Sequence, residues 1–388
     1  MAVYGVSRVG IAKLLTIMDP GEPVMLYIGI DQHRKQLTVS VRDESGNVVL
    51  RRQVSTHWEK VRAFFSELRE RAEVQGGYLA IVEICGFNHW LLKLLPECGC
   101  RETIVVQPEE KSKHKTDRRD ASQLSEVLWV NRDRLAQGLP ARGLRRIQVP
   151  DPAAQADRWL TSLRHNAGRE LTRAINRIKA VLRRHNLEQE CPTKGIHTKA
   201  ATKWLWTLPL SAVERIELEQ QLTRAGLLRE QVRHLQAQIE ARYEANAAAQ
   251  RIATLPGAAA YSALGLASRV GDVRRFPHPR SLANYWGLTP GSRNSGEVTD
   301  RLGSITKQGS ALARFLLGQL VLHVLREDAW MRGWFKAIKR RRGAKIARVA
   351  VMRRLATIIW HMLTRNEDYA CGGPPQARLK RQRAAARN

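Results

Sequence analysis

The chain has 388 residues, enough for two or three domains, and its 65 Lys and Arg against 36 Asp and Glu give a formal net charge of +29. So large a positive charge favours an anionic partner, and the phosphate backbone of nucleic acid is the natural one because cationic side chains release its counterions. No apolar stretch reaches the roughly eighteen residues that span a bilayer, and residues 1–25 lack the pattern of a secretory signal. We therefore expect an intracellular protein that binds nucleic acid and no membrane.

After a leader over residues 1–25, strands and helices alternate through residues 26–150. The expected strands are short and apolar or alternating, at 26–31, 36–42, 48–54, 79–83 and 103–106. The expected helices share a helical apolar period, at 57–73, 87–95 and 117–130. Three strands followed by alternating helices and strands predict an α/β domain with a mixed, RNase H-like sheet covered by helices.

Four acids in this domain form the first candidate site. Asp31 and Glu83 end expected strands, whereas Asp117 and Asp120 are three residues apart and share one face of an expected helix. Phosphodiester cleavage with two divalent ions needs carboxylates clustered from separate elements, and such a cluster suits Mg²⁺ or Mn²⁺. Each acid alone could be an ordinary surface charge, and Asp117 with Asp120 could be a salt-bridged helix start. Their joint order on these elements favours a metal site.

The middle and the end of the chain are expected to be mainly helical. Asp151 and Pro152 begin one long helix, and a second, over 213–247, carries a seam of apolar residues at heptad spacing. We interpret 151–250 as a helical, coiled-coil linker that joins two functional domains and offers a dimer contact. A mainly α domain follows over 251–365, with an amphipathic helix at 311–326 and a basic helical stretch over 339–354. The basic tail, 366–388, is expected to be disordered.

A serine in the C-terminal domain is the second candidate site. Ser295 lies in an Asn-Ser-Gly turn, where Gly296 would let the backbone approach a ligand closely. A serine hydroxyl needs a polarised phosphate before it can attack. Basic residues near one site or the other are candidate phosphate contacts, namely Arg293, Arg301, Lys307, Arg314, Lys115 and Arg118. An ordinary loop is the alternative interpretation, and Ser292 and Ser304 are rival hydroxyls.

Several short motifs together resemble one family. They are Gly29-Ile-Asp31-Gln-His33, Val82-Glu83-Ile-Cys-Gly86, Lys115-Thr-Asp117-Arg-Arg-Asp120-Ala121, Leu255-Pro-Gly257, Phe276-Pro277, Tyr285-Trp-Gly-Leu288, Asn294-Ser295-Gly296 and Gly303-Ser-Ile-Thr-Lys-Gln-Gly309. The chain resembles the serine transposases of bridge-RNA-guided insertion sequences, which pair an N-terminal RuvC-like four-acid (DEDD) domain with a C-terminal serine domain. The family often has two adjacent serines before the glycine, whereas here Asn294 takes the first position.

The resemblance implies a function and a set of partners. Asp31, Glu83, Asp117 and Asp120 would be the acidic tetrad that binds the metal, and Ser295 the nucleophile that forms a phosphoserine link to DNA. It implies a homo-oligomer, dimer to tetramer, in which the acids of one subunit work with the serine of another. Donor and target DNA would be chosen by a structured guide RNA from the same element. The expected location is then the bacterial cytoplasm, at the nucleoid.

Two other interpretations stay open from the residues. A metal-dependent, RuvC-like nuclease or junction resolvase would need the acids but not Ser295. A non-enzymatic DNA- or RNA-binding regulator would need neither, and its acids would be surface charges.

Overall fold

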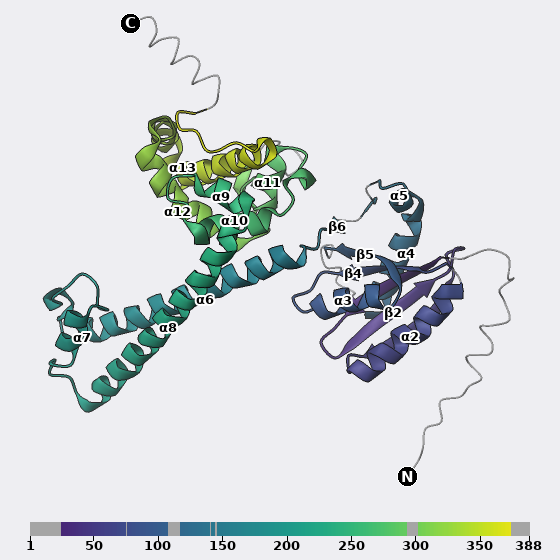
Figure 1. The fold of residues 1–388 in the computed structure, drawn as a ribbon, viewed down its shortest axis with the longest axis horizontal. Helices are drawn as coiled ribbons and strands as arrows, with labels where there is room; N and C mark the ends of the chain where they lie inside the picture. Colours follow the sequence, from purple (N-terminus) through teal and green to yellow (C-terminus); the bar gives the residue numbers. More distant parts are fainter. Residues whose placement is uncertain are drawn as a thin grey trace, which may run out of the picture. The chain divides into compact units, whose positions relative to one another are not determined.

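The computed structural model describes residues 25–74, 76–107, 117–139, 141–143, 146–292 and 302–373, although the side chains of some residues beside the gaps, 117–119 among them, lie outside the description. Contacts divide the chain into two units, 1–149 and 150–388. The predicted fold class is confirmed, because a mixed six-stranded sheet with helices precedes long helices and a mainly helical C-terminal region (Figure 1). The finer domain boundaries given above remain a prediction.

The N-terminal unit is built on one sheet with the strand order β3-β2-β1-β4-β5-β6. Its strands are β1 (Leu26–Gln32), β2 (Gln36–Arg42), β3 (Val48–Ser55), β4 (Tyr78–Glu83), β5 (Cys100–Val106) and β6 (Arg146–Ile147). The first three form an antiparallel meander, whereas β1, β4 and β5 run parallel. This arrangement places the carboxyl ends of β1 and β4 side by side.

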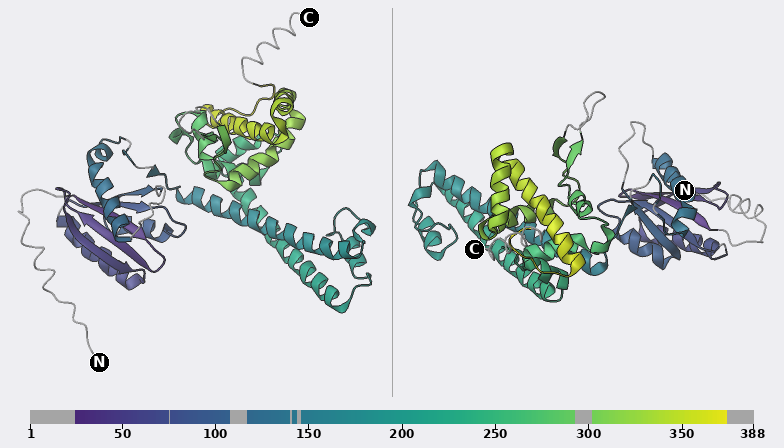
Figure 2. Two further views of the ribbon diagram at one scale, coloured as in Figure 1. Left: turned by 180° about the vertical axis from the view of Figure 1, so that it is seen from behind. Right: turned by 90° about the horizontal axis from the view of Figure 1, so that it is seen from above.

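Helices cover both faces of this sheet (Figures 1 and 2). They are α2 (Trp58–Val74), α3 (His89–Glu97), α4 (Asp117–Val130) and the short α5 (Arg132–Ala136). On one face, α2 and α3 pack on buried strand residues such as Ile28 and Ile30. On the other face, Leu128 of α4 packs on Tyr27 and Ile81. Because successive strand residues point to opposite faces, odd-numbered residues of β1 and β4 face α4.

The second unit begins with two long helices that form a hairpin, α6 (Pro152–Arg184) and α8 (Ala212–Glu244). Asp151 caps α6 by accepting from the Ala154 N–H at 2.8 Å, and Ser211 forms a capping box with Glu214 at the start of α8. The short α7 (Lys199–Leu205) lies at the hairpin tip (Figure 1). The seam residues of α8 include four that are buried, namely Leu218, Ala225, Leu228 and Ile239.

The remaining elements form a helical bundle around one hydrophobic core that includes Trp286, Leu316 and Leu355. They are α9 (Ala247–Ala253), α10 (Ala260–Val270), α11 (Pro279–Tyr285), β7 (Pro290–Ser292), β8 (Leu302–Ile305), α12 (Ala311–Glu327) and α13 (Ala329–Arg365), with a 3-10 turn at Val273–Arg275. Another 3-10 turn, Glu188–Glu190, lies between α6 and α7. The predicted basic stretch lies in α13, whose helix is interrupted at Gly343 (φ 83°, ψ 164°).

Arginines tie the hairpin to this bundle at the C-terminal end of α10. Arg158 of α6 donates to the Ser268 carbonyl at 2.7 Å, and Arg275 donates to the Val270 carbonyl at 3.1 Å. Arg269 is buried and donates to the hydroxyls of Thr161 and Ser310. Burial lowers the pKa of Arg269 to about 10. The C-terminal end of α10 carries the negative end of its helix dipole, which stabilises these cations. These arginines therefore have a structural role.

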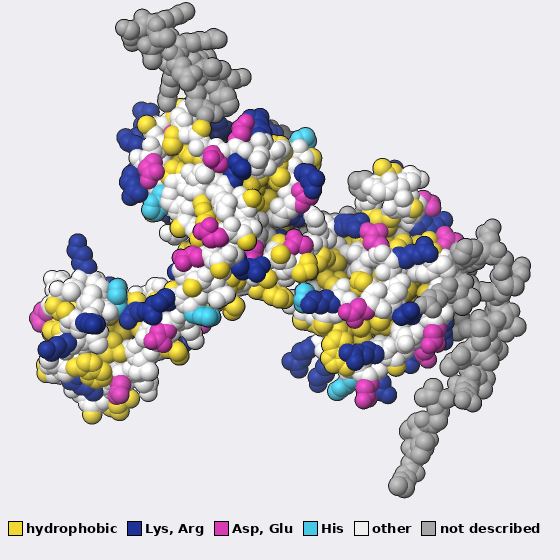
Figure 3. Space-filling view, in the orientation of Figure 1, with side chains coloured by type: hydrophobic (Ala, Val, Ile, Leu, Met, Phe, Trp, Pro, Cys, Tyr) yellow, Lys and Arg dark blue, Asp and Glu magenta, His cyan; other side chains and the backbone are white. Residues whose placement is uncertain are grey.

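Cationic side chains are spread over both units on the face seen in Figure 3. Over the part of the chain that the structure describes, no helix is both long enough and apolar enough to cross a membrane.

Candidate active site

The backbone pairing of β1 and β4 sets the positions of the first two predicted acids. Ile30 pairs with Val82 in parallel register, so Asp31 and Glu83 follow side by side at the carboxyl ends of neighbouring strands. Both are odd-numbered, and both therefore project toward the face that α4 covers. Asp31 is buried, at 8% exposure, and Glu83 is half-buried. Strand register thus brings two of the four predicted acids together.

A close approach at Gly29 brings α4 to the same edge. A Cβ atom at Gly29 would lie 2.2 Å from the Ala121 carbonyl oxygen and 2.4 Å from the Ser125 nitrogen, so only glycine admits the helix backbone there. Asp120 precedes Ala121, and Asp31 comes two residues after Gly29 on the same face of β1. The contact therefore sets the first turn of α4, which carries Asp120, beside the end of β1.

Polar side chains of β2 hold α4 in this position. Ser125 of α4 donates a hydrogen bond to Ser40 at 3.1 Å, and Ser40 stands opposite Gly29 in the sheet. Arg42 donates to the Ser125 hydroxyl at 3.3 Å and to the Glu126 carboxylate at 3.1 Å. These positioning residues could not be predicted from the sequence, because a polar residue in a strand gives no indication of what it faces.

Two further residues lie beside Asp31. His33 Nε2 is 3.0 Å from Asp31 Oδ2. Thr38 pairs with Asp31 across β1 and β2, and its buried hydroxyl has no hydrogen-bond partner among the described residues. An orphaned buried hydroxyl is costly unless a ligand or water satisfies it.

The chemistry of the predicted acids suits a hard divalent cation, because carboxylate oxygens are the ligands that Mg²⁺ and Mn²⁺ prefer. No group of three or more His, Cys, Asp or Glu side chains is spaced to hold a metal within the described residues, which exclude the Asp117 side chain. Asp117 is the first residue of α4, while Lys115 and the Arg118 side chain also lie outside the description.

The predicted serine region lies in the second unit, between β7 and β8. These strands pair antiparallel, with Pro290 opposite Ile305 and Ser292 opposite Leu302. Ser295, Arg293 and Arg301 fall in the connection between the strands, outside the described residues. The structure therefore describes the base of this hairpin, while the assignment of Ser295 stays a prediction.

Two glycines fix the base of the β7–β8 hairpin. A Cβ at Gly309 (φ 70°) would lie 1.9 Å from the Tyr285 carbonyl oxygen, and one at Gly287 (φ 65°) would lie 2.2 Å from the Gln308 oxygen. The Lys307 N–H donates to the Gly287 carbonyl at 3.1 Å. These contacts join the segment before β7 to the segment after β8, so both ends of the connection that carries Ser295 are held.

The two predicted phosphate contacts in the described part of this region differ. The Lys307 side chain is exposed, on a residue with φ 57°. Arg314 Nη1 donates to the carbonyls of Trp286 at 3.1 Å and Gln308 at 2.8 Å. Burial lowers the pKa of Arg314. Arg314 thus fixes the hairpin base, and a phosphate contact for either residue stays a prediction.

Comparisons with known proteins agree with both halves of the chain. The IS116/IS110/IS902 transposase family matches residues 249–336, and a transposase DEDD domain of the IS110 type matches residues 28–187. The transposase for insertion sequence element IS1111A of Coxiella burnetii is 28% identical over 362 residues, covering 89% of this chain and 91% of that protein. A probable family 20 transposase of Pseudomonas aeruginosa is 26% identical over 355 residues, covering 89% and 98%.

A third relative, the transposase for insertion sequence element IS1328 of Yersinia enterocolitica, is 24% identical over 360 residues, covering 90% of this chain and 99% of that protein. These similarities overturn the regulator interpretation. The chain belongs to the IS110/IS116/IS902 family: it is an insertion-sequence transposase, a DNA transposition enzyme with an N-terminal DEDD domain, which implies a divalent metal, and a C-terminal family 20 transposase domain.

Proposed function

We propose that this transposase breaks and rejoins DNA through a phosphoserine intermediate, with Ser295 as the nucleophile and with Asp31, Glu83, Asp117 and Asp120 as ligands of Mg²⁺ or Mn²⁺. The observation that carries the proposal is the meeting of two parallel strand ends with the helix that crosses β1 at Gly29. Metal-dependent phosphodiester chemistry needs carboxylates carried to one place by separate elements, and the proposed ligands lie on β1, β4 and α4.

The proposed chemistry conserves bond energy. The Ser295 oxygen forms a bond to phosphorus, the bond from phosphorus to the leaving sugar oxygen breaks, and that oxygen takes a proton. A sugar hydroxyl from the other DNA then attacks the same phosphorus and releases the serine, so a phosphodiester is formed without hydrolysis. A divalent cation held by the carboxylates supplies charge neutralisation at phosphate. Arg293, Arg301 and Lys307 are proposed to bind the phosphate oxygens.

Sequence choice is proposed to come from a structured RNA encoded by the same element. The support is physical: 65 cationic residues spread along the chain favour contact with phosphate backbones. Base pairing can then select donor and target while the protein contacts mainly backbone. The acids and the serine lie in separate units, which is compatible with a dimer or tetramer in which they come from different subunits.

A hydrolytic nuclease is the second candidate. Metal-dependent cleavage would need the four acids Asp31, Glu83, Asp117 and Asp120 but not Ser295. Such an enzyme would leave cut DNA without a protein link. The distinction between the two candidates rests on Ser295.

A denaturing gel tests the proposal. The protein is incubated with Mg²⁺, labelled donor and target DNA, and RNA transcribed from the flanks of its gene. We expect a protein-linked DNA band that Ser295→Ala abolishes, while Ser304→Ala, a matched change at an exposed serine of β8, leaves it. A linked band that persists in Ser295→Ala would refute the assignment, and cut DNA without any linked band would establish the nuclease. Omitting the RNA should remove the band as well.

A further inference from the structure

Three strands of the N-terminal sheet end at one edge, and two helices begin there. The ends of β1 and β3 flank the start of β2, where Leu37 pairs with Gln32 on one side and with Val54 on the other. The end of β4 lies on the far side of β1. Because α2 follows β3 and α3 follows β4, both helices begin at the edge that carries Asp31 and Glu83.

Large aromatic side chains are exposed where these helices begin. Trp58, the first residue of α2, contacts Trp90 of α3 edge-on, with ring centroids 5.4 Å apart. The Arg62 guanidinium lies 5.2 Å from the Trp58 ring centre. With both contacts made, Trp58 is still 51% exposed, and Phe87, in the segment before α3, is 47% exposed. We call Trp58, Phe87 and Trp90 the aromatic edge, because exposed rings grouped in this way mark an interaction surface.

Hydrogen bonds attach the aromatic edge to the end of β1. Gln32, the last residue of β1, donates from Nε2 to the Phe87 carbonyl at 3.3 Å. On the other side, the Thr56 N–H donates to the Lys35 carbonyl at 3.0 Å, and its hydroxyl donates to the Arg34 carbonyl at 3.1 Å. The segment before α3 and the segment before α2 are therefore both held beside the strand end that carries the first predicted acid.

The segments around the aromatic edge are basic. Residues 32–36, 55–62 and 84–93 contain one acid, Glu59, and five cations, namely Arg34, Lys35, Lys60, Arg62 and Lys93. All five cationic side chains are exposed, and none forms an ion pair with another described residue. Cations that no carboxylate neutralises are available to the phosphates of a nucleic acid.

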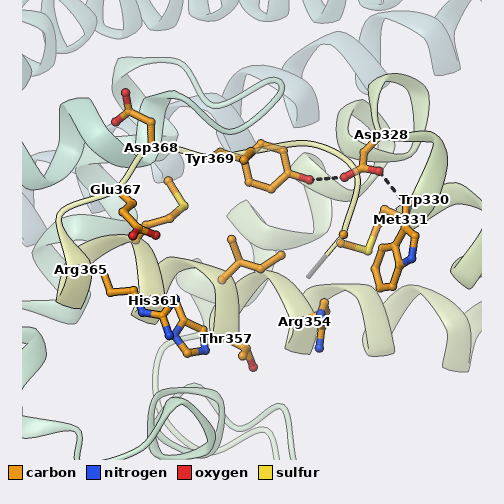
Figure 4. Close-up of a pocket in the computed structure, with 14 residues that line it drawn as sticks. Asp328, Trp330, Met331, Arg354, Thr357, His361, Arg365, Glu367, Asp368 and Tyr369 are labelled. Carbon is orange, nitrogen blue, oxygen red and sulfur yellow. Dashed lines mark hydrogen bonds between the residues drawn. The ribbon is translucent and has the colours of Figure 1, made fainter. Parts of the chain in front are cut away.

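A pocket of about 630 Å³ beside α13 lacks this combination (Figure 4). Its charged lining residues are two arginines and three carboxylates, namely Arg354, Arg365, Asp328, Glu367 and Asp368. Its Trp330 ring is already covered, because Gly373 and Arg354 both lie against it. The aromatic edge, in contrast, has exposed rings and an excess of cations.

We propose that the aromatic edge binds unpaired nucleotides of the DNA strand whose phosphate enters the proposed metal site. The bases stack on the exposed rings, and the phosphates between them contact the cations of the β1–β2 turn and of α2, namely Arg34, Lys35 and Arg62. Only an unpaired base offers its face to a side chain, and rings beside cations are the usual receptor for single-stranded DNA. The inference rests on the proposed position of the metal site, but binding of the strand needs neither the metal nor Ser295, so its test needs no catalysis.

Photo-crosslinking of the full-length protein tests this surface. The probe is a short single-stranded thymidine oligonucleotide with one base replaced by 5-iodouracil, and the attachment point is mapped by proteolysis and mass spectrometry. We expect adducts within residues 55–62 or 84–93, and these would support the surface even if no DNA became linked to Ser295. Adducts confined to other parts of the chain would overturn the proposal, as would adducts at these segments from an RNA probe but not from DNA.

Two matched tryptophan variants separate base stacking from general phosphate attraction. Trp58 and Trp206 are both about half exposed, but Trp206 lies at the end of α7 in the other unit. We expect Trp58→Ala to weaken binding of the single-stranded oligonucleotide about ten-fold, Trp58→Phe to restore most of that loss, and Trp206→Ala to have no effect. Binding of the same sequence as a duplex should not change. Equal losses for single strand and duplex, or for Trp58→Ala and Trp206→Ala, would contradict base stacking, with thermal melting as the check on folding.

Two matched arginine variants test the phosphate contacts. Arg62 lies over Trp58, whereas Arg52 lies over Phe64 and pairs with Glu67 at 3.0 Å. We expect Arg62→Gln to reduce the slope of log affinity against log salt for the single strand by about 0.7, the value for one phosphate contact. Arg52→Gln should leave that slope unchanged. Equal slopes in the two variants would contradict the proposed phosphate contacts.

Discussion

The two predicted catalytic features of this transposase are held in different ways. In the N-terminal unit, the sheet edge that carries Asp31 and Glu83 is fixed by strand register and by α4, whose backbone contacts Gly29. The predicted serine lies on a connection whose two ends are fixed by Gly287, Gly309 and Arg314. The contrast teaches that the proposed metal ligands Asp31 and Glu83 are positioned by the sheet, whereas for the proposed nucleophile only the two ends of its connection are described as held.

The largest expected effect is on the rate of DNA cleavage, and it tests whether the predicted acids bind a metal or are ordinary surface charges. Asp31→Asn and Asp120→Asn should each lower DNA cleavage roughly a hundred-fold or more, since losing a metal ligand removes several kcal/mol of transition-state stabilisation. Asp133→Asn is the control, because that side chain is 75% exposed on α5. Cleavage rates at saturating Mg²⁺ provide the measurement, and normal rates in both acid variants would remove the metal site from the account.

Gly29→Ala tests whether α4 is held by its close approach to β1. The added methyl would meet the Ala121 and Ser125 backbone, which has to move, so we expect a loss of about 3 kcal/mol in unfolding free energy together with slower cleavage. Gly86→Ala should leave stability nearly unchanged, because a Cβ there meets no atom within 4 Å. Urea denaturation gives the unfolding free energy of both variants. Equal values would show that α4 does not pack against Gly29 as described.

Gly309→Ala applies the same test to the serine hairpin. The φ of 70° and the contact with the Tyr285 carbonyl make an L-residue strained there, so we expect a loss of about 2 kcal/mol and weaker capture of DNA. Gly318→Ala, in the middle of α12 with open space around it, should instead add up to about 1 kcal/mol. Thermal unfolding of both variants measures the change in stability. A more stable Gly309→Ala would contradict the close packing of Gly309 on the Tyr285 carbonyl.

The smallest expected effect concerns the basic kink of α13 at Gly343. Arg342→Gln should weaken DNA binding modestly and reduce the slope of log affinity against log salt by about 1, because one phosphate contact is lost. Arg183→Gln is the control, since Arg183 already pairs with Glu188. Binding measured over a series of salt concentrations reports both slopes, and an unchanged slope for Arg342→Gln would mean that the kink does not contact phosphate.

Much of this fold could be predicted because its strands and helices show regular apolar patterns and local capping residues in the sequence. The expected strands at 26–31, 36–42 and 79–83 match β1, β2 and β4 to within about a residue at each end, since each alternates or is continuously apolar. The Asp151-Pro152 start of α6 was also readable, because capping chemistry is local.

Other features depend on distant contacts that a single sequence does not reveal. The pairing of β7 with β8 and the short α10 and α11 were not predicted, because α10 is nearly all buried and the other segments are too short to show a clear period. Gly29 appeared only as part of a motif, since its role depends on a helix that comes about ninety residues later.

The most direct measurement of the central claim is to identify the residue that carries DNA. The covalent complex, formed with Mg²⁺ and the element's own RNA and DNA, would be digested with nuclease and protease, and the remaining nucleotide adduct located by mass spectrometry. We predict a phosphodiester adduct on Ser295, which Asp31→Asn prevents from forming. An adduct on Ser292, on Ser304 or on a tyrosine would contradict it.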